Sequence, residues 1–535
     1  MPTQWSTFPV EFRGGLISNL STLQHGSNAP GSATILQNFE VSKTGGYAKV
    51  KGFSKFSTTT VPGTGPILAL KVISSGRVIV ARKVDQAAVD AQANLASGDL
   101  NKTAYYVGTG TTWTLLDDGA ATPAYAVSGS TGGGKARHTE YNFDGDDKTV
   151  FVDGTNYPAI YNTSGDDFEF MTSSNSTDVQ GAEHVALFKN TAFYAKGNNI
   201  FFSAPFTVDD FSAANGAGSI NVGHDVTGLT VFRDQLIIFT TDTIKRLTGS
   251  TSADYQIASI TDRIGCINGD TIQEVGGDVM YLAPDGIRLL SATDRIGDFG
   301  LDVTSDTIRQ DAVDFLAATD MFASVILREK GQYRIFAYVT SEQEGTAKGL
   351  IATKFVSQGA AGIAWSTTKG IKAYIADSTY QGDAETAMFA NNDGYIYTME
   401  SGSSFDGSAI EGLYESPYLP ISDPQVRKTF YKMTLYVEPT GGFDIEAHIK
   451  YDLGERDVIQ PPVINIETTG EAVSYYGAST SVYGTSTYGG TLDSVYANNI
   501  IGSGKTIAIR IEDNSTNPTF TLDTAVLEFS QNDRQ

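Results

Sequence analysis

Apolar and polar residues alternate in short bursts through the middle of this 535-residue chain, and the same unit recurs. Each unit reads as a strand, a tight polar or glycine-containing turn, and a second strand. The clearest cases pair Leu187–Ala195 with Ile200–Ser203, Val231–Phe239 with Thr243–Leu247, Val279–Leu282 with Ile287–Leu290, and Ala387–Ala390 with Tyr395–Thr398. Units at this spacing are typical of a radial β-architecture. We therefore expect an all-β fold built on a β-propeller of about six to eight blades.

The propeller is expected to occupy residues 61–410. A hairpin opens it at 66–82, where two apolar runs flank the turn Ser74-Ser75-Gly76. Two interruptions are predicted: a short alanine-rich helical insertion near 84–98, and a helix near 302–318 that begins at Ser305-Asp306.

The residue pattern at both ends of the chain differs from the repeated strand-turn-strand units. Residues 1–60 are extended and rich in glycine, and they have few local partners. From 411 to 535 the strands alternate apolar and polar positions, as in Lys432–Glu438 and Phe443–Tyr451. We expect 411–535 to form a second, β-sandwich-like platform domain, either as a separate sandwich or as one domain shared with the N-terminal arm. The 1–60 arm is expected to pack on this domain or on a neighbouring subunit.

The formal net charge of −24 changes the picture of partners. Such a surface repels DNA, which argues against specific DNA recognition. A passage lined with acid is nevertheless well suited to DNA that must slide without sticking. Residues 1–56 depart from the trend, with five basic residues against two acidic ones, a balance of +3. This excess fits chance in a short window, or a docking segment for an acidic partner.

The single cysteine, Cys266, lies among apolar neighbours and is expected in the core. The sequence Met1–Trp5 has no basic and apolar leader pattern, and no stretch approaches the apolar length of a membrane-spanning helix. The expectation is synthesis in a reducing cytoplasm.

No pattern of catalytic, cofactor-binding or metal-binding residues is recognisable. The five histidines are scattered without metal-ligand spacing, and no nucleophile elbow or phosphate-binding loop occurs. The acidic run Asp144–Asp147 lacks the length and the final Glu of a calcium loop, and an exposed turn explains it better. The chain is accordingly predicted not to be an enzyme and to need no cofactor.

Several segments, taken in order, resemble the nozzle, or tail tubular protein B, family of short-tailed phages. The N-terminus carries Phe12-Arg13-Gly14-Gly15-Leu16, Asn19, Pro30-Gly31, Leu36-Gln37-Asn38-Phe39, Gly45-Gly46-Tyr47 and Gly52-Phe53. Further along, similar segments are Asn199–Pro205, Asp262–Cys266, Val279–Ile287, and Asp423–Lys428 leading into Lys432–Val437. The insertion at 84–98 and the Tyr-Gly stretch at 475–489 have no counterpart that we recognise.

The resemblance implies a propeller joined to a platform domain, with six copies forming a ring around an axial channel. The ring would lie in the virion tail below the adaptor ring, support tail fibres, pass genomic DNA during ejection and meet the host outer surface. It would be assembled in the host cytoplasm. Candidate residues for the assembly interface are Phe12, Arg13, Gly14, Gly15, Asn38, Phe39, Arg427 and Lys428. The glycines at 14–15 and 45–46 are expected to adopt positive φ, or to permit close backbone approach, where chains cross.

Two other functions remain open at this stage. The chain could be a receptor-binding or glycan-degrading tail protein, with Tyr475, Tyr476, Tyr483 and Tyr488 as a stacking surface for sugars. That stretch also fits an inter-subunit loop. A propeller scaffold unrelated to phage is the third hypothesis.

Overall fold

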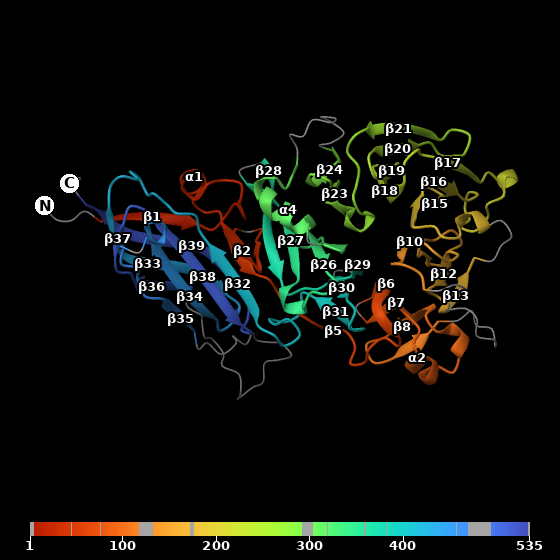
Figure 1. The fold of residues 1–535 in the computed structure, drawn as a ribbon, viewed down its shortest axis with the longest axis horizontal. Coiled ribbons are helices and arrows are strands. Elements are labelled where there is room, and N and C mark those ends of the chain that lie inside the picture. Colours follow the sequence, from red (N-terminus) through yellow and green to blue (C-terminus); the bar gives the residue numbers. More distant parts are fainter. Residues whose placement is uncertain are drawn as a thin grey trace.

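The computed structural model describes residues 5–43, 45–74, 76–116, 132–171, 176–291, 303–317, 319–357, 360–381, 384–455, 457–468 and 494–532. It consists mainly of β-strands. A ring of small sheets lies at one end of the molecule, and a body that contains both chain ends lies at the other (Figure 1).

Six small antiparallel sheets form separate blades. Four have four consecutive strands: β6–β9 (Thr64–Ser74, Arg77–Lys83, Thr103–Gly108, Trp113–Leu115), β10–β13 (Arg137–Tyr141, Lys148–Val152, Ala159–Asn162, Asp167–Phe170), β14–β17 (His184–Phe188, Thr191–Lys196, Asn199–Phe202, Gly218–Asn221) and β18–β21 (Val226–Phe232, Gln235–Thr240, Ile244–Thr248, Gln256–Thr261). The fifth has three: β22–β24 (Gln273–Val275, Asp278–Ala283, Gly286–Leu289). The sixth joins β29–β31 (Ile375–Gln381, Ala384–Ala390, Ile396–Met399) to β5 (Phe53–Lys55).

Strands β25–β28 (Met321–Leu327, Gln332–Tyr338, Lys348–Ser357, Ala360–Lys369) complete the ring. They belong to a nine-stranded sheet, and β25 lies between β22 and β29. The ring closes where β29 contacts β6. The last blade is completed by β5, a strand from the N-terminal segment that pairs with β31. The predicted β-propeller of six to eight blades is confirmed.

Local chemistry explains the hairpins within the blades. Strands β18 and β19 are joined by Arg233 and Asp234, whose φ angles are +47° and +60°. Two successive positive φ angles define the tight turn that best matches the twist of paired strands. Apolar residues in the flanking strands, such as Leu236 and Ile238, are fully buried between neighbouring blades. The hairpin predicted at 66–82 is likewise confirmed as β6 and β7.

The remaining strands form what we call the two-sheet body. A seven-stranded sheet combines β1 (Ser6–Glu11), β3 (Phe39–Val41), β4 (Tyr47–Lys49), β33 (Lys428–Pro439), β36 (Val495–Asn499), β37 (Ser503–Gly504) and β39 (Phe520–Gln531). The rest of the nine-stranded sheet is β2 (Ile35–Gln37), β32 (Ile410–Glu415), β38 (Ile507–Ser515), β34 (Asp444–Tyr451) and β35 (Ile464–Glu467). The two sheets share one hydrophobic core, in which Phe430 stacks on Tyr451 at 5.4 Å between ring centroids.

The nine-stranded sheet crosses the boundary that the sequence suggested at residue 411. It runs from β25–β28 through β2 to β32, so the C-terminal strands continue a sheet that also completes the propeller. Strand β1 pairs with β39, and β2 pairs with β32, which builds the N-terminal segment into the same body. The C-terminal strands therefore do not form a separate sandwich.

Helices are few and short. The helical insertion contains α2 (Gln86–Ala91), capped by the Asp85 side chain, which accepts a hydrogen bond from the backbone N–H of Ala88 at 2.8 Å. The helix predicted near 302–318 is present as a 3₁₀ turn, Asp306–Ile308, followed by α4 (Arg309–Ala317). Helix α1 (Thr22–Asn28) lies in the N-terminal segment. Among the described residues, no helix has the length and apolar character needed to cross a membrane.

Candidate functional site at the propeller axis

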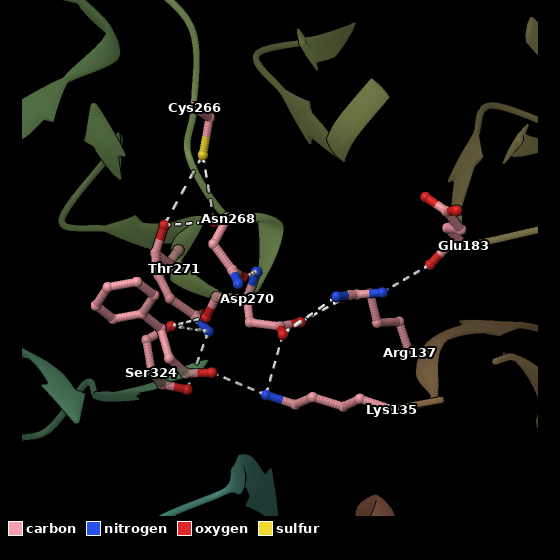
Figure 2. Close-up of polar contacts among 10 residues, drawn as sticks. Lys135, Arg137, Glu183, Cys266, Asn268, Asp270, Thr271 and Ser324 are labelled. Carbon is pink, nitrogen blue, oxygen red and sulfur yellow. Dashed lines mark hydrogen bonds and ion pairs between the residues drawn. The ribbon is translucent and has the colours of Figure 1, made fainter. Parts of the chain in front are cut away.

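The centre of the propeller is organised around one carboxylate, Asp270. It lies in a 3₁₀ turn, η4 (Gly269–Thr271), just before the blade that starts with β22. The Asn268 side chain accepts a hydrogen bond from the backbone N–H of Asp270 at 2.8 Å, which fixes the start of this turn. The Thr271 hydroxyl donates to the Asn268 carbonyl at 2.6 Å, and the thiol of buried Cys266 lies 3.8 Å from the same hydroxyl (Figure 2).

Two cations at the start of the β10–β13 blade converge on this carboxylate from across the ring. Lys135 Nζ lies 3.1 Å from Asp270 Oδ2, and both side chains are almost fully buried. Arg137 binds both carboxylate oxygens, with Nε 2.7 Å from Oδ1 and Nη2 3.2 Å from Oδ2. A two-pronged contact of this kind is strong and fixes geometry as well as charge.

Backbone and hydroxyl groups extend the cluster to further blades. Arg137 Nη1 donates to the carbonyl of Glu183 beside β14, at 3.1 Å. Lys135 Nζ donates to the carbonyl of Phe322 in β25, at 3.0 Å, and the Ser324 hydroxyl donates to the Asp270 carbonyl at 2.6 Å. Figure 2 shows these groups reaching toward one another from separate ribbons. The cluster thus ties four elements of the ring together at its centre.

The electrostatics of the cluster follow from burial and pairing. Burial alone would raise the pKa of Asp270, but the charges of Lys135 and Arg137 outweigh it and hold this pKa well below its usual range. Burial lowers the pKa of Lys135, while Asp270 opposes that effect. Burial, followed by the charge of Arg137, lowers the pKa of the nearby His184 to about 3. At neutral pH, His184 is therefore an uncharged imidazole beside an ion cluster.

A pocket of about 300 Å³ surrounds the cluster and is lined from every side of the ring. Besides Lys135, Arg137 and Asp270, its polar lining includes His138, His184, Gln273, Ser324 and Asp377. Asp377 accepts the backbone N–H of Val72 at 2.7 Å and lies 3.9 Å from the His138 ring. Within the described ranges no group of three metal-ligating side chains converges. The pocket can offer hydrogen bonds to a small polar molecule, and its ion pairs close the centre of the ring.

Most of the interface candidates from the sequence are interior residues. Phe12 and Phe39 are buried in the core of the two-sheet body. Asn38 is also buried, at a φ of +52°, and its side-chain amide donates to the carbonyls of Lys369 and Glu411, each at 3.0 Å. Lys428 has its amine enclosed by the carbonyls of Pro420, Asp423 and Lys505. These four side chains make their contacts within one subunit and offer no surface to another.

The predicted glycines adopt the expected backbone. Gly14, Gly15, Gly45 and Gly46 have φ angles of +96°, +72°, +106° and +83°, which confirms that prediction. A Cβ on Gly15 would lie 2.8 Å from the Trp365 carbonyl oxygen, so this glycine also permits a chain crossing. Of the interface candidates, only Arg13 and Arg427 expose much of their side chains, at 68% and 48%. The interface hypothesis therefore rests on these two.

Other sequence-based interpretations can also be placed. The Asp144–Asp147 run connects β10 to β11, and Asp144 pairs with Lys148 at 2.6 Å, as expected for an exposed turn. The basic N-terminal residues Lys49 and Lys55 pair with Asp513 and Asp406 of the same chain. The Tyr-Gly stretch at 475–489 lies outside the described residues.

Sequence reasoning missed Lys135, Arg137 and Asp270. The alternation Lys135-Ala136-Arg137 does direct both cations to one side of an extended chain, and Asn268-Gly269-Asp270 is a recognisable turn. Nothing local, however, links two segments 133 residues apart.

No family model matches the chain, and no curated protein matches it. Among solved structures it is similar to the extracellular domain of a one-component system from B. thetaiotaomicron, at 10% identity and a TM-score of 0.36, covering 78% of this chain and 48% of that one. It is also similar to the Pan2 WD40 domain of Neurospora crassa, at 7% identity and a TM-score of 0.33, covering 63% and 90%.

A third similar structure is a glycoside hydrolase family 43 arabinoxylan arabinofuranohydrolase from Bacillus subtilis, at 9% identity and a TM-score of 0.27, covering 90% of this chain and 99% of that one. The chain spans about half the length of the B. thetaiotaomicron structure. Similarities this low concern the fold alone. The third structure is an enzyme, which runs against the expectation that the chain is not one, and that expectation is withdrawn.

Proposed function

We propose that the chain is the nozzle subunit of a short-tailed phage tail. In this role several copies, six by resemblance to the family, form a ring in the virion tail that continues the tail channel below the adaptor ring. The ring passes genomic DNA during ejection and supports the tail fibres.

One observation carries the proposal: the residues behind the family resemblance have exacting roles in the fold. Gly15 has positive φ and sits against Trp365 of β28, which leaves no room for a side chain. Asn38 has positive φ and joins two further segments through its amide. Few other residues fit such positions without strain. The resemblance therefore falls on positions at which this fold depends on the residue present, and this supports the proposal.

The filled propeller axis favours a DNA channel that is enclosed between several subunits over one that runs through a single propeller. The Lys135–Asp270–Arg137 cluster occupies the centre of the ring of blades, where the pocket holds only about 300 Å³. A DNA duplex, whose major groove alone is roughly 12 Å wide, cannot pass there. A DNA path therefore requires an opening enclosed by several copies. Copies with a net charge of −24 would line such an opening with little tendency to bind phosphate.

The deciding experiment is the mass of the purified chain, alone and with its adaptor ring, together with negative-stain images. The proposal expects a ring of about six copies with a central opening when the adaptor is present. The adaptor ring without this chain is the control. A chain that stays monomeric or trimeric with the adaptor would refute the proposal.

A second candidate is a receptor-binding or glycan-degrading tail protein, and the axial pocket is the observation that favours it. Its volume lies at the lower end for small-molecule sites, roughly 300–1,000 Å³, and its lining offers the carboxylate of Asp377 and the imidazole of His138. A panel of host surface glycans would test it. Binding or oligosaccharide release that Asp377→Asn abolishes would favour this candidate, and no response from the wild type would exclude it.

A further inference from the structure

A groove runs along one edge of the two-sheet body. It consists of two adjoining hollows, of about 740 Å³ and 910 Å³, that share Lys43 and Phe355. The first reaches Arg328 and Lys354 beside the β22–β23 turn, and the second reaches Arg13 beside β1. We call this feature the Lys43 groove. Phe8, Pro9 and Phe355 give it an apolar lining.

The charge of the Lys43 groove is unusual for so acidic a chain. Lys43 Nζ donates to the Glu329 carbonyl at 2.6 Å, and Lys354 Nζ donates to the Gly276 carbonyl at 2.7 Å. Within the part of the chain that the structure describes, neither amine has a carboxylate partner within 4.0 Å. Arg328 adds a third cation, loosely paired with Glu385 at 3.4 Å. Glu11, Glu274 and Asp523 also line the groove, so its unpaired positive charge is confined to Lys43 and Lys354, beside the apolar surface at Phe355.

The opposite edge of the body carries a segment of complementary character. The loop 457–463, which we call the Ile459 loop, leads into β35 and exposes Ile459 at 84% and Val463 at 47%. Acidic residues lie in the loop and on the strands beside it: Asp457 in the loop, Glu455 before it in sequence, Glu467 on β35, and Asp444 and Glu446 on the paired strand β34. In the sequence, Arg456 stands between Glu455 and Asp457. An apolar side chain as exposed as Ile459 in an acidic setting is suited to a basic, partly apolar partner surface.

The Ile459 loop is held in place by its own contacts. The Gln460 side chain accepts the backbone N–H of Tyr451 at 2.8 Å and donates to the Tyr451 carbonyl at 3.2 Å. Val458 packs against the core of the body, and Pro461 and Pro462 restrict the backbone that follows. A loop fixed before docking loses little conformational entropy when it binds.

Groove and loop lie at opposite edges of the same two sheets. In the seven-stranded sheet, β1 and β4 flank one side of β39, and β36 forms the far edge beyond β33. In the nine-stranded sheet, β35 is the last strand on that same far side. Figure 1 shows β1 and β35 on opposite sides of the body. Two different surfaces placed this way make a head-to-tail contact, which can repeat from copy to copy and close into a ring.

We infer that the Ile459 loop of one copy docks in the Lys43 groove of a second copy of this chain. Ile459 and Val463 cover the apolar lining at Phe355, and the carboxylates around the loop pair with Lys43 and Lys354. Copies that each carry −24 repel one another, and this local match supplies attraction and fixes the orientation. The inference rests on the proposed function, because it names the contact that builds the ring.

Cysteine cross-linking tests this contact directly, because the only native cysteine, Cys266, is buried. The double variant Lys354→Cys/Ile459→Cys, assembled with the adaptor ring and oxidised, should give a ladder of covalent oligomers up to the ring size. Each single variant should stay monomeric on a denaturing gel. The matched control is Lys189→Cys/Ile459→Cys, which places one cysteine on a distant blade.

Charge reversal gives an independent measurement on the same assembly. Lys43→Glu/Lys354→Glu should weaken ring formation at least tenfold, and adding Glu455→Lys/Asp457→Lys should restore much of it. Lys43, Glu455 and Asp457 are exposed and Lys354 is half-buried, so the melting temperature should stay near that of the wild type and is measured as a control. A wild type that forms no ring with its adaptor would refute the proposed function, and this contact with it. A wild type that forms rings while the cysteine pair gives no ladder would refute the docking contact alone.

Discussion

Lys49 Nζ lies 3.0 Å from Asp513 Oδ1, and neither side chain is accessible to solvent. The pair joins β4 to β38, across 464 residues of sequence. The lysine also donates to the Ser515 carbonyl at 3.1 Å. Burial lowers the pKa of Lys49 and raises the pKa of Asp513, and the attraction between the two charges opposes both shifts. The interior of the two-sheet body thus contains a charge pair in which each member depends on the other.

Removing Lys49 alone is expected to destabilise the protein strongly. Lys49→Met leaves the Asp513 carboxylate buried without a cation, which costs roughly 3–5 kcal/mol. The double variant Lys49→Met/Asp513→Leu should recover most of this loss. Urea unfolding followed by circular dichroism measures the effect. Lys55→Met is the control, because its partly exposed pair with Asp406 should contribute about 1 kcal/mol or less. Equal losses in Lys49→Met and Lys55→Met would contradict the prediction.

Asp270→Asn should lower the stability of the propeller, because it removes the charge that holds Lys135 and Arg137 at the axis. The substitution leaves Lys135 and Arg137 facing a neutral amide, and Lys135 is almost fully buried. We expect a loss of roughly 3–5 kcal/mol in the free energy of unfolding. Hydrogen exchange should show faster exchange in β10 and β25, which the cluster connects. Asp144→Asn, in an exposed turn, should change stability by less than about 1 kcal/mol. Unchanged exchange in both strands would argue against a role for the cluster in closing the ring.

Stability should fall in acid partly because of His184. Its pKa is about 3 in the folded chain, below the unfolded value near 6.5, so the unfolded state binds the extra proton first. The stability that neutral His184 contributes is present above pH 6.5 and declines as the pH falls toward 3, by up to about 1.4 kcal/mol per pH unit. Thermal melts of His184→Gln should show a shallower decline across this window. His224→Gln alters an exposed histidine and should follow the wild type.

Comparing Gly15 with Gly45 separates two costs of adding a side chain: backbone strain at positive φ, and steric clash with neighbouring atoms. Both have positive φ, but only Gly15 has a backbone neighbour within 4 Å of the added Cβ. Gly45→Ala should cost roughly 1–2 kcal/mol from the left-handed backbone alone. Gly15→Ala should cost clearly more, because the Cβ would meet Trp365. The difference between the two denaturation midpoints measures the steric cost of placing a Cβ against the Trp365 backbone. Equal midpoints would show that the Trp365 backbone moves aside at no cost, which would contradict the prediction.

The parts of the fold that the sequence predicts well are those whose partners are close along the chain. The β6–β7 hairpin and the β18–β19 hairpin have their turn and both apolar runs within one short stretch, so alternation is sufficient. Strand β2 could not be predicted in this way, because Thr34 and Gln37 bond to residues near 411–415. The expected boundary at residue 411 failed for the same reason: β32 pairs with β2, a strand from the other end of the chain.

The candidate site was beyond sequence reasoning on physical grounds. Lys135 and Asp270 acquire their roles only when separate blades meet at the axis, and their local patterns, Lys135-Ala136-Arg137 and Asn268-Gly269-Asp270, do not reveal that pairing. The N-terminal motifs did identify important residues, but of a different kind. Phe12 and Asn38 are essential to the interior of one subunit. The surface that we assign to assembly lies in the groove beside them.

Because β1 pairs with β39, the edge of the two-sheet body that we propose for assembly is complete only after the C-terminal strand has been synthesised. Strand β1 leaves the ribosome first, and its partner strand ends at Gln531. At roughly 5–20 residues per second, about half a minute to two minutes separate the two. The blades between them can fold during that time, while the groove edge at β1 stays incomplete. A prematurely terminated chain never gains β39. Such chains would lack the groove edge that the proposed ring contact needs, and would be left out of that ring without any separate proofreading factor.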